Sequence, residues 1–308
     1  MAALQSAHYN RCIDIDAANG VPSEHPTGRP GTEPAPLTRL AISRAPPDLR
    51  LWRLDLDLQA PLPTSALALL DDAEQARLDR FHRHEDKARF ALTRAALKRL
   101  LAGDDADASI RFDYTPAGRP VWRDANVHFN VAHSGALALI ALSERRAVGV
   151  DVEWRTEVDV DALSAIVLTP GERATLQACA AQARRDAFYR YWVCKEAALK
   201  ATGQGIAEAL QRIEVLADDV DADTRGDASR DTRRDSRHET RRIRCVDAGM
   251  DDARLLASLE LRLLPLPAAY TGAVAWASRD GAAAAGTGGG PSDKRPFSIF
   301  NRRSATSK

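Results

Sequence analysis

VGVDVE, at Val148–Glu153, determines the fold and the chemistry of this chain together with FNVAHSG at Phe129–Gly135 and WVCKEAALK at Trp192–Lys200. In VGVDVE, Asp151 and Glu153 alternate with valines. Successive side chains of a β-strand point to opposite faces, so both carboxylates are predicted to project from one face of a strand. The alternation therefore predicts a strand whose acidic side chains lie together.

WVCKEAALK places Trp192, Glu196 and Lys200 four residues apart, on one face of a predicted helix. Three carboxylates that converge from a strand and a helix would form a hard-cation site with open positions. Such sites usually hold Mg²⁺, which takes its remaining oxygens from water and substrate phosphates. His133, Lys195 and Lys200 would add positive charge near those phosphates. The residues therefore indicate transfer of a phosphate-linked group.

Each feature also has an ordinary structural explanation. Asp151 and Glu153 are equally compatible with a solvated strand face, and the charged residues of 195–200 with ion pairing on a helix surface. His133 lies in a His-Ser-Gly turn, where a structural histidine with satisfied hydrogen bonds is common. The occurrence of all of them together, in order and at workable spacing, favours the functional interpretation.

Composition limits the classes of protein to consider. The 308 residues are 44% hydrophobic, enough for a core in one large or two modest domains. Lys+Arg and Asp+Glu are equal at 43 each, so net charge favours neither nucleic acid nor a membrane surface as a partner. The four cysteines include no CxxC pair, which argues against a zinc cluster and gives no disulfide framework. No run approaches the roughly 20 apolar residues of a membrane span, so no transmembrane helix is predicted. With no secretory signal, we expect a cytoplasmic protein.

Two α/β units are predicted, with the chemistry at their junction. We expect an N-terminal half over 47–150 and a C-terminal half over 151–278. Flexible segments are expected at 1–46, rich in Pro and Gly, at 218–244, a charged insertion with almost no apolar residue, and at 279–308. Periodicity predicts helices at 65–80, 87–101, 159–167, 170–183 and 186–201, and strands at 49–58, 110–114, 127–130, 136–143, 147–153, 211–216, 255–264 and 270–277.

Five segments in order give a resemblance to a known family. The chain resembles the 4′-phosphopantetheinyl transferases of the larger, surfactin-synthetase-activating type, from about 80 to 213. The resemblance implies an α+β fold of two similar halves related by a pseudo-twofold, with the active site at their junction, in a monomer. The segments are RFHRHEDKAR at 80–89, GRP at 118–120, FNVAHSG, VGVDVE and WVCKEAALKATGQG.

The resemblance also implies a reaction. Such enzymes transfer the phosphopantetheine arm of coenzyme A (CoA) to a serine of an apo carrier protein and release adenosine 3′,5′-bisphosphate. It makes Asp151, Glu153 and Glu196 the predicted ligands of Mg²⁺, and Lys200 a catalytic residue that contacts the phosphates. Glu196 or a metal-bound water would take the proton of the serine.

The remaining matched positions are basic or polar and are predicted to bind CoA. Arg83 and His84 match a pair for the 3′-phosphate, although a histidine there makes the charge dependent on pH. The predicted CoA-binding residues are Arg83, His84, Arg89, Arg119, His133, Ser134, Lys195 and Lys200.

The sequence is compatible with several carrier proteins as the acceptor of phosphopantetheine. Carrier proteins of fatty-acid, polyketide or non-ribosomal peptide synthases all present a suitable serine, and 169–185 is only one conceivable docking segment. Two other classes of protein compete with a transferase: a CoA- or nucleotide-binding protein without turnover, and a metal-dependent phosphohydrolase of CoA. All three carboxylates would be superfluous in a simple binder, which favours an enzyme.

Overall fold

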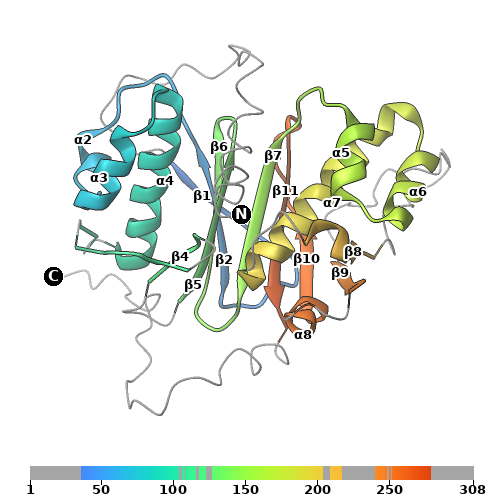
Figure 1. The fold of residues 1–308 in the computed structure, drawn as a ribbon. Helices are drawn as coiled ribbons and strands as arrows, with labels where there is room; N and C mark the ends of the chain where they lie inside the picture. The colour runs from blue at the N-terminus through green and yellow to red at the C-terminus, as the bar shows by residue number, and fades with distance from the viewer. Residues whose placement is uncertain are drawn as a thin grey trace.

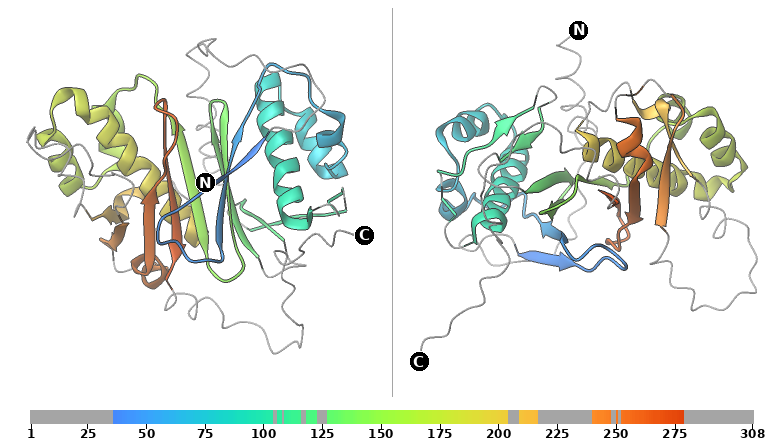
Figure 2. Two further views of the ribbon diagram at one scale, coloured as in Figure 1. Left: turned by 180° about the vertical axis from the view of Figure 1, so that it is seen from behind. Right: turned by 90° about the horizontal axis from the view of Figure 1, so that it is seen from below.

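The computed structural model places two α/β halves side by side, each with helices on the outer face of its own sheet (Figure 1). Views from behind and from below show α2–α4 and α5–α7 on opposite outer sides of the two sheets (Figure 2). The structure describes residues 36–103, 106–107, 109–115, 118–122, 127–203, 209–216, 240–247, 250 and 252–278.

The N-terminal half is built on an antiparallel four-stranded sheet of order β1-β2-β6-β5. Helix α4 covers one face of this sheet, and a short ribbon of β3 and β4 precedes β5. Its strands are β1 (Leu37–Leu40), β2 (Leu49–Asp55), β3 (Asp113–Tyr114), β4 (Pro120–Val121), β5 (His128–Ser134) and β6 (Leu137–Ser143), and its helices are α2 (Thr64–Leu67), α3 (Asp72–Asp79) and α4 (His84–Ala102).

The C-terminal half has a five-stranded sheet of order β7-β11-β10-β9-β8, with α7 packed on one face. Its strands are β7 (Val148–Trp154), β8 (Ile213–Val215), β9 (Thr240–Cys245), β10 (Leu259–Leu263) and β11 (Tyr270–Ala277), and its helices are α5 (Val160–Val167), α6 (Pro170–Ala178), α7 (Ala181–Thr202), the 3₁₀ turn η3 (Leu210–Arg212) and α8 (Ala253–Ala257).

Both halves repeat one connectivity. In the N-terminal half a strand (β2) is followed by helices and then by a hairpin (β5–β6) whose second strand returns beside the first. In the C-terminal half β7, α5–α7 and the hairpin β10–β11 do the same. The prediction of an α+β fold with two similar halves is therefore confirmed.

Strand alternation divides the core into layers. Val148, Val150 and Val152 of β7 pack into an apolar cluster that also contains residues of β2, β6 and β11. This cluster lies between the two sheets, so each sheet buries one face against the other sheet and one against its own helices. Because the period of a strand is two, the residues between the valines face α7.

Some predicted boundaries are wrong. Leu37–Leu40 lies inside the segment expected to be flexible, but it forms β1, because its backbone completes the edge of β2. Thr240–Cys245, assigned partly to the charged insertion, forms β9 beside β10. The predicted strand at 255–264 begins with helix α8 and becomes strand only at Leu259. Of the other parts of the expected flexible segments, 36 and 41–46 form neither helix nor strand, and 1–35, 218–239 and 279–308 lie outside the described residues.

Two predicted helices are divided differently. The helix expected over 65–80 is interrupted, because Asp71 caps α3 in a reciprocal pair with Glu74: each side chain accepts the backbone N–H of the other residue. The helix expected over 170–183 ends at Ala178, and α7 then begins at Ala181. No helix in the described parts of the chain has the length and apolar character that crossing a membrane requires.

Candidate active site

Helix α7 lies directly on strand β7 at Gly149. A Cβ atom at this position would be 2.0 Å from the carbonyl oxygen of Ala197 and 2.4 Å from the backbone nitrogen of Ala201. Any other residue would therefore push the helix off the strand. Asp151 and Glu153 share the face of Gly149, so the glycine determines how closely α7 approaches both carboxylates.

Lys200 lies among the carboxylates that α7 and β7 bring together. Its Nζ is 2.5 Å from Asp151 Oδ1 and 3.9 Å from Glu196 Oε2. The other oxygen of Asp151, Oδ2, is buried without a hydrogen-bond partner, and so is Glu196 Oε2. Buried carboxylate oxygens without partners are costly, because they have lost water and gained nothing in exchange. Two such oxygens beside one lysine, on facing elements, fit a site that a cation could complete.

Burial changes the protonation of all three carboxylates. It raises the pKa of Asp151, although the ammonium of Lys200 offsets part of that rise. It also raises the pKa of Glu196 to about 7, with Lys200 opposing the shift and Asp151 adding to it. The pKa of Glu153 is raised well above its usual value by burial and by the nearby carboxylates of Asp151 and Glu196. The three acidic groups therefore repel one another in a dry environment.

A divalent cation would relieve this repulsion, and hard carboxylate oxygens are the donors that Mg²⁺ prefers. In the described residues, however, no three His, Cys, Asp or Glu side chains form a group already arranged to hold a metal ion. Lys200 supplies the positive charge nearest Asp151 instead. The donor chemistry fits a cation, whereas three-fold ligation by Asp151, Glu153 and Glu196 stays a prediction.

Two side chains of β5 join the halves across the site. Asn130 Oδ1 accepts the backbone N–H of Val150 at 2.9 Å, and Ser134 Oγ accepts that of Trp154 at 3.0 Å. Ser134 also donates to Glu153 Oε2 at 3.2 Å. β5 and β7 belong to different sheets, so these side chains replace the missing ladder of backbone hydrogen bonds. They hold the segment with Asp151 and Glu153 at both ends.

His133 and Arg89 lie beside this junction. Arg89 donates from Nε to the carbonyl oxygen of Gly135 at 2.9 Å and pairs with Asp86 at 2.8 Å. Burial, together with the positive charges of Arg89 and Lys200, lowers the pKa of His133 to about 4. The imidazole is therefore neutral at physiological pH in this structure. The structure shows Arg89 holding the turn that follows β5.

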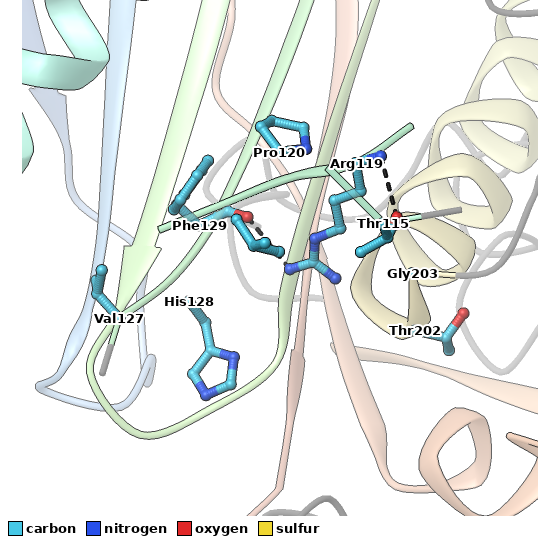
Figure 3. Close-up of a pocket in the computed structure, with 9 residues that line it drawn as sticks. Thr115, Arg119, Pro120, Val127, His128, Phe129, Thr202 and Gly203 are labelled. Atoms are coloured by element: carbon cyan, nitrogen blue, oxygen red, sulfur yellow. Dashed lines mark hydrogen bonds between the residues drawn. The ribbon is translucent and has the colours of Figure 1, made fainter. Parts of the chain in front are cut away.

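Arg119 spans the two halves at the C-terminal end of α7. Its guanidinium donates to the carbonyl oxygens of Lys200 at 3.3 Å and Phe129 at 3.2 Å. It lines a cavity of about 240 Å³ together with His128 and Gly203 (Figure 3). The other residues of the cavity wall are Thr115, Pro120, Val121, Val127, Phe129 and Thr202. A cavity with a cationic wall therefore lies at the C-terminal end of α7, where Arg119 binds the carbonyl oxygen of Lys200.

Arg83 and His84 lie at the exposed beginning of α4, where Arg83 is the N-cap residue. His84 Nε2 is 2.8 Å from the carbonyl oxygen of Ala60. Both side chains are open to solvent, so an incoming ligand can reach them. Their predicted contact with a 3′-phosphate stays a prediction.

Comparison with known proteins identifies the family. Residues 62–145 match the family described as "4′-phosphopantetheinyl transferase, N-terminal", and residues 147–251 match the 4′-phosphopantetheinyl transferase superfamily. The chain is 35% identical over 175 residues to the 4′-phosphopantetheinyl transferase HetI of Nostoc sp., which covers 54% of this chain and 73% of that relative. This chain belongs to the 4′-phosphopantetheinyl transferase family.

Other members of the family are similar over the same region. A protein of Synechocystis sp. named as a putative 4′-phosphopantetheinyl transferase is 36% identical over 173 residues, 54% of this chain and 70% of that protein. The 4′-phosphopantetheinyl transferase Sfp of Bacillus subtilis is 26% identical over 154 residues, 48% of this chain and 67% of Sfp. The two matched family regions meet between β6 and β7, where the two halves also meet.

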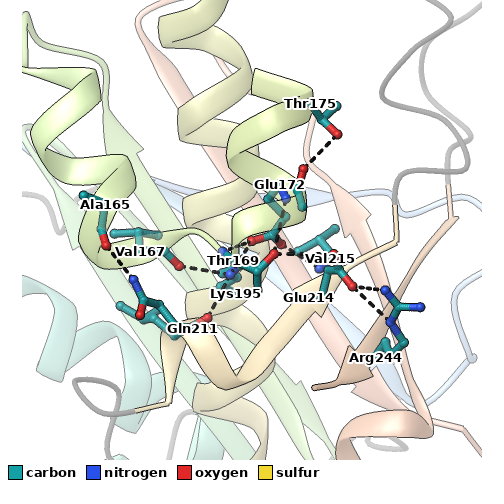
Figure 4. A network of polar contacts seen from close by, with 12 residues as sticks. Ala165, Val167, Thr169, Glu172, Thr175, Lys195, Gln211, Glu214, Val215 and Arg244 are labelled. Carbon is teal, nitrogen blue, oxygen red and sulfur yellow. Dashed lines mark hydrogen bonds and ion pairs between the residues drawn. The ribbon is translucent and has the colours of Figure 1, made fainter. Parts of the chain in front are cut away.

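Lys195 does not lie in the candidate active site of this transferase, in contrast to the predicted contact with CoA phosphates. Its side chain is completely buried, and its Nζ is 2.5 Å from Glu172 Oε2 (Figure 4). It also donates to the carbonyl oxygens of Val167 and Leu210. Neighbouring residues of a helix are rotated by about 100°, so Lys195 projects away from the face of Glu196 and Lys200.

Sequence reasoning missed Asn130 as a site residue. It lies in the same segment as His133 and Ser134, and strand alternation places Asn130 and Ser134 on one face. That pattern was a usable signal for a polar edge. The partner strand β7 could not be inferred from it, because the two strands are joined by side chains rather than by a ladder.

Proposed function

We propose that this chain transfers the 4′-phosphopantetheine arm of CoA to a serine hydroxyl of an apo acyl or peptidyl carrier protein and releases adenosine 3′,5′-bisphosphate. The observation that carries the proposal is the pair of buried carboxylates, Asp151 and Glu196, each with an oxygen that has no hydrogen-bond partner, beside Lys200. Membership of the 4′-phosphopantetheinyl transferase family supports the same reaction.

Mg²⁺ is the proposed cofactor, held by Asp151, Glu196 and Glu153. When bound, it supplies positive charge that stabilises the negative charge developing on the leaving bisphosphate. Ser134 orients Glu153 through its hydrogen bond at 3.2 Å. The hydrogen bonds of Asn130 and Ser134 to β7 form a seam between β5 and β7. Together with Gly149, this seam keeps both strand carboxylates at a fixed distance from α7.

Lys200 is the residue that we expect to change partners during the reaction. In this structure its ammonium neutralises Asp151. A cation at the carboxylates would neutralise Asp151 in place of Lys200. The ammonium of Lys200 would then be able to bind the pyrophosphate of CoA. Phosphoryl-type transfer mainly requires positioning and electrostatic stabilisation, and a lysine beside a carboxylate-held cation provides both.

Glu196 is the proposed general base. Without a cation, burial raises its pKa to about 7. A bound cation would lower that pKa and keep Glu196 ionised, so that the carboxylate could accept a proton. The serine oxygen forms a bond to the phosphorus that carries pantetheine, and the bond from that phosphorus to the bridging oxygen breaks. The serine proton passes to Glu196, and the bridging oxygen leaves with the adenosine bisphosphate.

The nucleotide part of CoA is proposed to bind toward the cavity at Arg119. The cavity lies at the end of α7, and its wall contains a guanidinium and His128. Arg89, Arg83 and His84 are the other cationic or titratable groups proposed to meet the phosphates, and His133 would donate or accept a hydrogen bond as a neutral ring.

A monomer in the cytoplasm is the proposed state. Both halves of one chain contribute to the site, because Ser134 of β5 contacts Glu153 of β7. A second copy is therefore not needed to complete it. Cys179, Cys194 and Cys245 are free thiols, which supports a reducing compartment.

Intact mass spectrometry tests the reaction. An apo carrier protein incubated with this chain, CoA and Mg²⁺ should gain one phosphopantetheine, roughly 340 Da. The gain should disappear when EDTA is added. Loss of CoA without labelling of the carrier would favour a hydrolase, and binding of CoA without turnover on several apo carriers would favour a binding protein. Either result would contradict the proposal.

A further inference from the structure

The N-terminal half contains a buried ion pair between its long helix and the helix before it. Lys98 of α4 is completely buried, and its Nζ is 2.7 Å from Glu74 Oε2. The same ammonium donates to the carbonyl oxygen of Leu69 at 2.7 Å. Glu74 is the third residue of α3 and forms the capping box with Asp71. We name the pair Glu74–Lys98 the N brace.

The C-terminal half repeats the central contacts of this arrangement. Lys195 of α7 is completely buried, with Nζ 2.5 Å from Glu172 Oε2 and 3.0 Å from the carbonyl oxygen of Val167. Glu172 is the third residue of α6 and forms a capping box with Thr169. In both halves the carbonyl oxygen that accepts from the lysine belongs to the residue two positions before the N-cap of the shorter helix. These residues are Leu69 before Asp71 and Val167 before Thr169. We name the pair Glu172–Lys195 the C brace.

The two braces differ in their further contacts. In the N brace, Arg94 of α4 is a second cation beside Glu74, with Nη1 3.3 Å from Oε1. In the C brace, the further contacts join other elements of the fold. Lys195 also donates to the carbonyl oxygen of Leu210 in η3 at 2.8 Å, and Glu172 Oε1 accepts the backbone N–H of Val215 in β8 at 2.8 Å. It thereby joins the end of α5, the beginning of α6, α7, η3 and β8 (Figure 4). A buried ammonium tolerates few positions, because each displacement leaves a charge or a carbonyl without its partner.

The residue after each lysine differs between the halves. Lys98 is followed by Arg99, whose guanidinium bonds the carbonyl oxygen of Ser65 at 3.1 Å. Lys195 is followed by Glu196, which lies among the carboxylates. Along one rigid helix, fixing the side chain of Lys195 also fixes the rotation and height of the next residue. The C brace is therefore coupled directly to a carboxylate of the site. The N brace lies nine residues along α4 from Arg89, the nearest predicted CoA-binding residue of that helix.

We propose that Lys195 is a positioning residue for the carboxylate cluster: through the C brace it holds α7 so that Glu196 lies opposite Asp151. It acts without touching CoA or the carrier protein. The inference rests on the proposed function for its kinetic consequence, but its effect on cation binding stands apart from turnover.

The two braces provide a matched pair of variants. Lys195→Met and Lys98→Met each remove one buried ammonium and keep the length of the side chain. Each variant takes a buried cation from a glutamate, so both should lower the melting temperature. Glu74 keeps Arg94 at 3.3 Å, so we expect a drop of about 10 °C for Lys195→Met and a smaller drop for Lys98→Met. The full-length chain is used for each, and Mn²⁺ binding is measured by electron paramagnetic resonance without CoA. The Mg²⁺ concentration for half-maximal transfer and the KM for CoA are measured in parallel.

Lys195→Met should weaken Mn²⁺ binding about tenfold and raise the half-maximal Mg²⁺ concentration by a similar factor, as expected when a residue that orients a metal ligand is lost. Lys98→Met should change either quantity less than twofold. Equal effects of the two variants on Mn²⁺ binding would show that the C brace only stabilises the fold and would overturn the inference. A changed KM for CoA with unchanged Mn²⁺ binding would overturn it too, and would return Lys195 to a phosphate site.

Milder variants keep the test decisive if either methionine variant fails to fold. Glu172→Gln and Glu74→Gln retain an oxygen acceptor and remove only the charge. Glu172→Gln should weaken Mn²⁺ binding about threefold, and Glu74→Gln should leave it unchanged. If the wild-type chain binds Mn²⁺ but labels no carrier, the proposed function fails while this comparison still holds. A wild-type chain that binds no Mn²⁺ overturns the inference together with the cation site.

Discussion

The N-terminal and C-terminal halves share connectivity and a buried brace but differ on the surface between strand and helix. In the N-terminal half, Trp52 and Leu54 of β2 pack into the apolar cluster under α4. In the C-terminal half, the corresponding surface of β7 carries Asp151 and Glu153 under α7. The framework is thus repeated, whereas the charged groups are not. Stability and chemistry can therefore be separated in this molecule by changing one half and keeping the other as a control.

The largest effect is expected at the carboxylates. Asp151→Asn and Glu196→Gln should each reduce transfer by at least about 10³-fold, because they remove an anionic oxygen that faces the developing charge. Melting temperatures should stay the same or rise, since the raised pKa values show that these ionised groups destabilise the fold. Arg99→Ala, at the position after Lys98 in the N-terminal half, is the control and should retain normal transfer. Near-normal transfer in either carboxylate variant would contradict the assignment of the site.

Lys200→Met should have the next largest effect. Transfer should slow by about 10²-fold, and the KM for CoA should rise, because a cation on the phosphates is lost. Lys98→Met is the control on α4 and should leave the KM for CoA unchanged. Steady-state kinetics over a range of CoA concentrations measure both values. An unchanged KM in Lys200→Met would remove Lys200 from the phosphate site.

Removal of a hydrogen bond from the seam between β5 and β7 should have a moderate effect on transfer. Asn130→Ala removes the acceptor of the Val150 N–H and should lower kcat about tenfold, since β7 is then joined to β5 at one end only. Ser143→Ala is the matched control: Ser143 is a buried polar residue on β6 that accepts the backbone N–H of Arg146 at 3.0 Å. Its kcat should change less than twofold. Equal losses in both variants would show that the seam has no special role in the site.

The most specific effect concerns the pH dependence of stability. The pKa of Glu196 is about 7 in the folded chain, against an ordinary value of 4.5. The folded state therefore binds the proton more tightly than the unfolded state. Its stabilising effect is complete below about pH 4.5 and is lost as the pH rises toward 7, a change of about 3 kcal/mol in the free energy of unfolding.

Melting curves between pH 4.5 and 8 in EDTA measure this loss. Glu196→Gln has no titrating group at the position, so its curve should decline less steeply than that of the wild type. Saturating Mg²⁺ should also flatten the wild-type curve, because a bound cation stabilises the ionised form. Identical curves for wild type and Glu196→Gln would contradict the raised pKa.

Short-range patterns predicted the site better than they predicted its surroundings. The alternation in VGVDVE correctly places Asp151 and Glu153 on one face, and the four-residue spacing brings Glu196 and Lys200 together. The wrong assignment of Lys195 has a tertiary cause. Its direction depends on how α5, α6 and η3 pack against α7, which the helix pattern does not contain.

The fold shows the same division between local and non-local information. The break before α3 was readable, since Asp71 and Glu74 have the spacing of a capping box. β1 and β9 were missed because each is stabilised by pairing with a neighbouring strand rather than by its own composition. The seam of Asn130 and Ser134 depends on two sheets meeting edge to edge, and no local pattern specifies that meeting.

The most direct test of the account is the intact mass of an apo carrier protein after incubation with CoA, Mg²⁺ and either the wild-type chain or Asp151→Asn. The account predicts a gain of roughly 340 Da with the wild type and no gain within the same time with Asp151→Asn, although both chains melt at similar temperatures. Equal labelling by the two chains would contradict the claim that the buried carboxylates of the C-terminal half carry the chemistry.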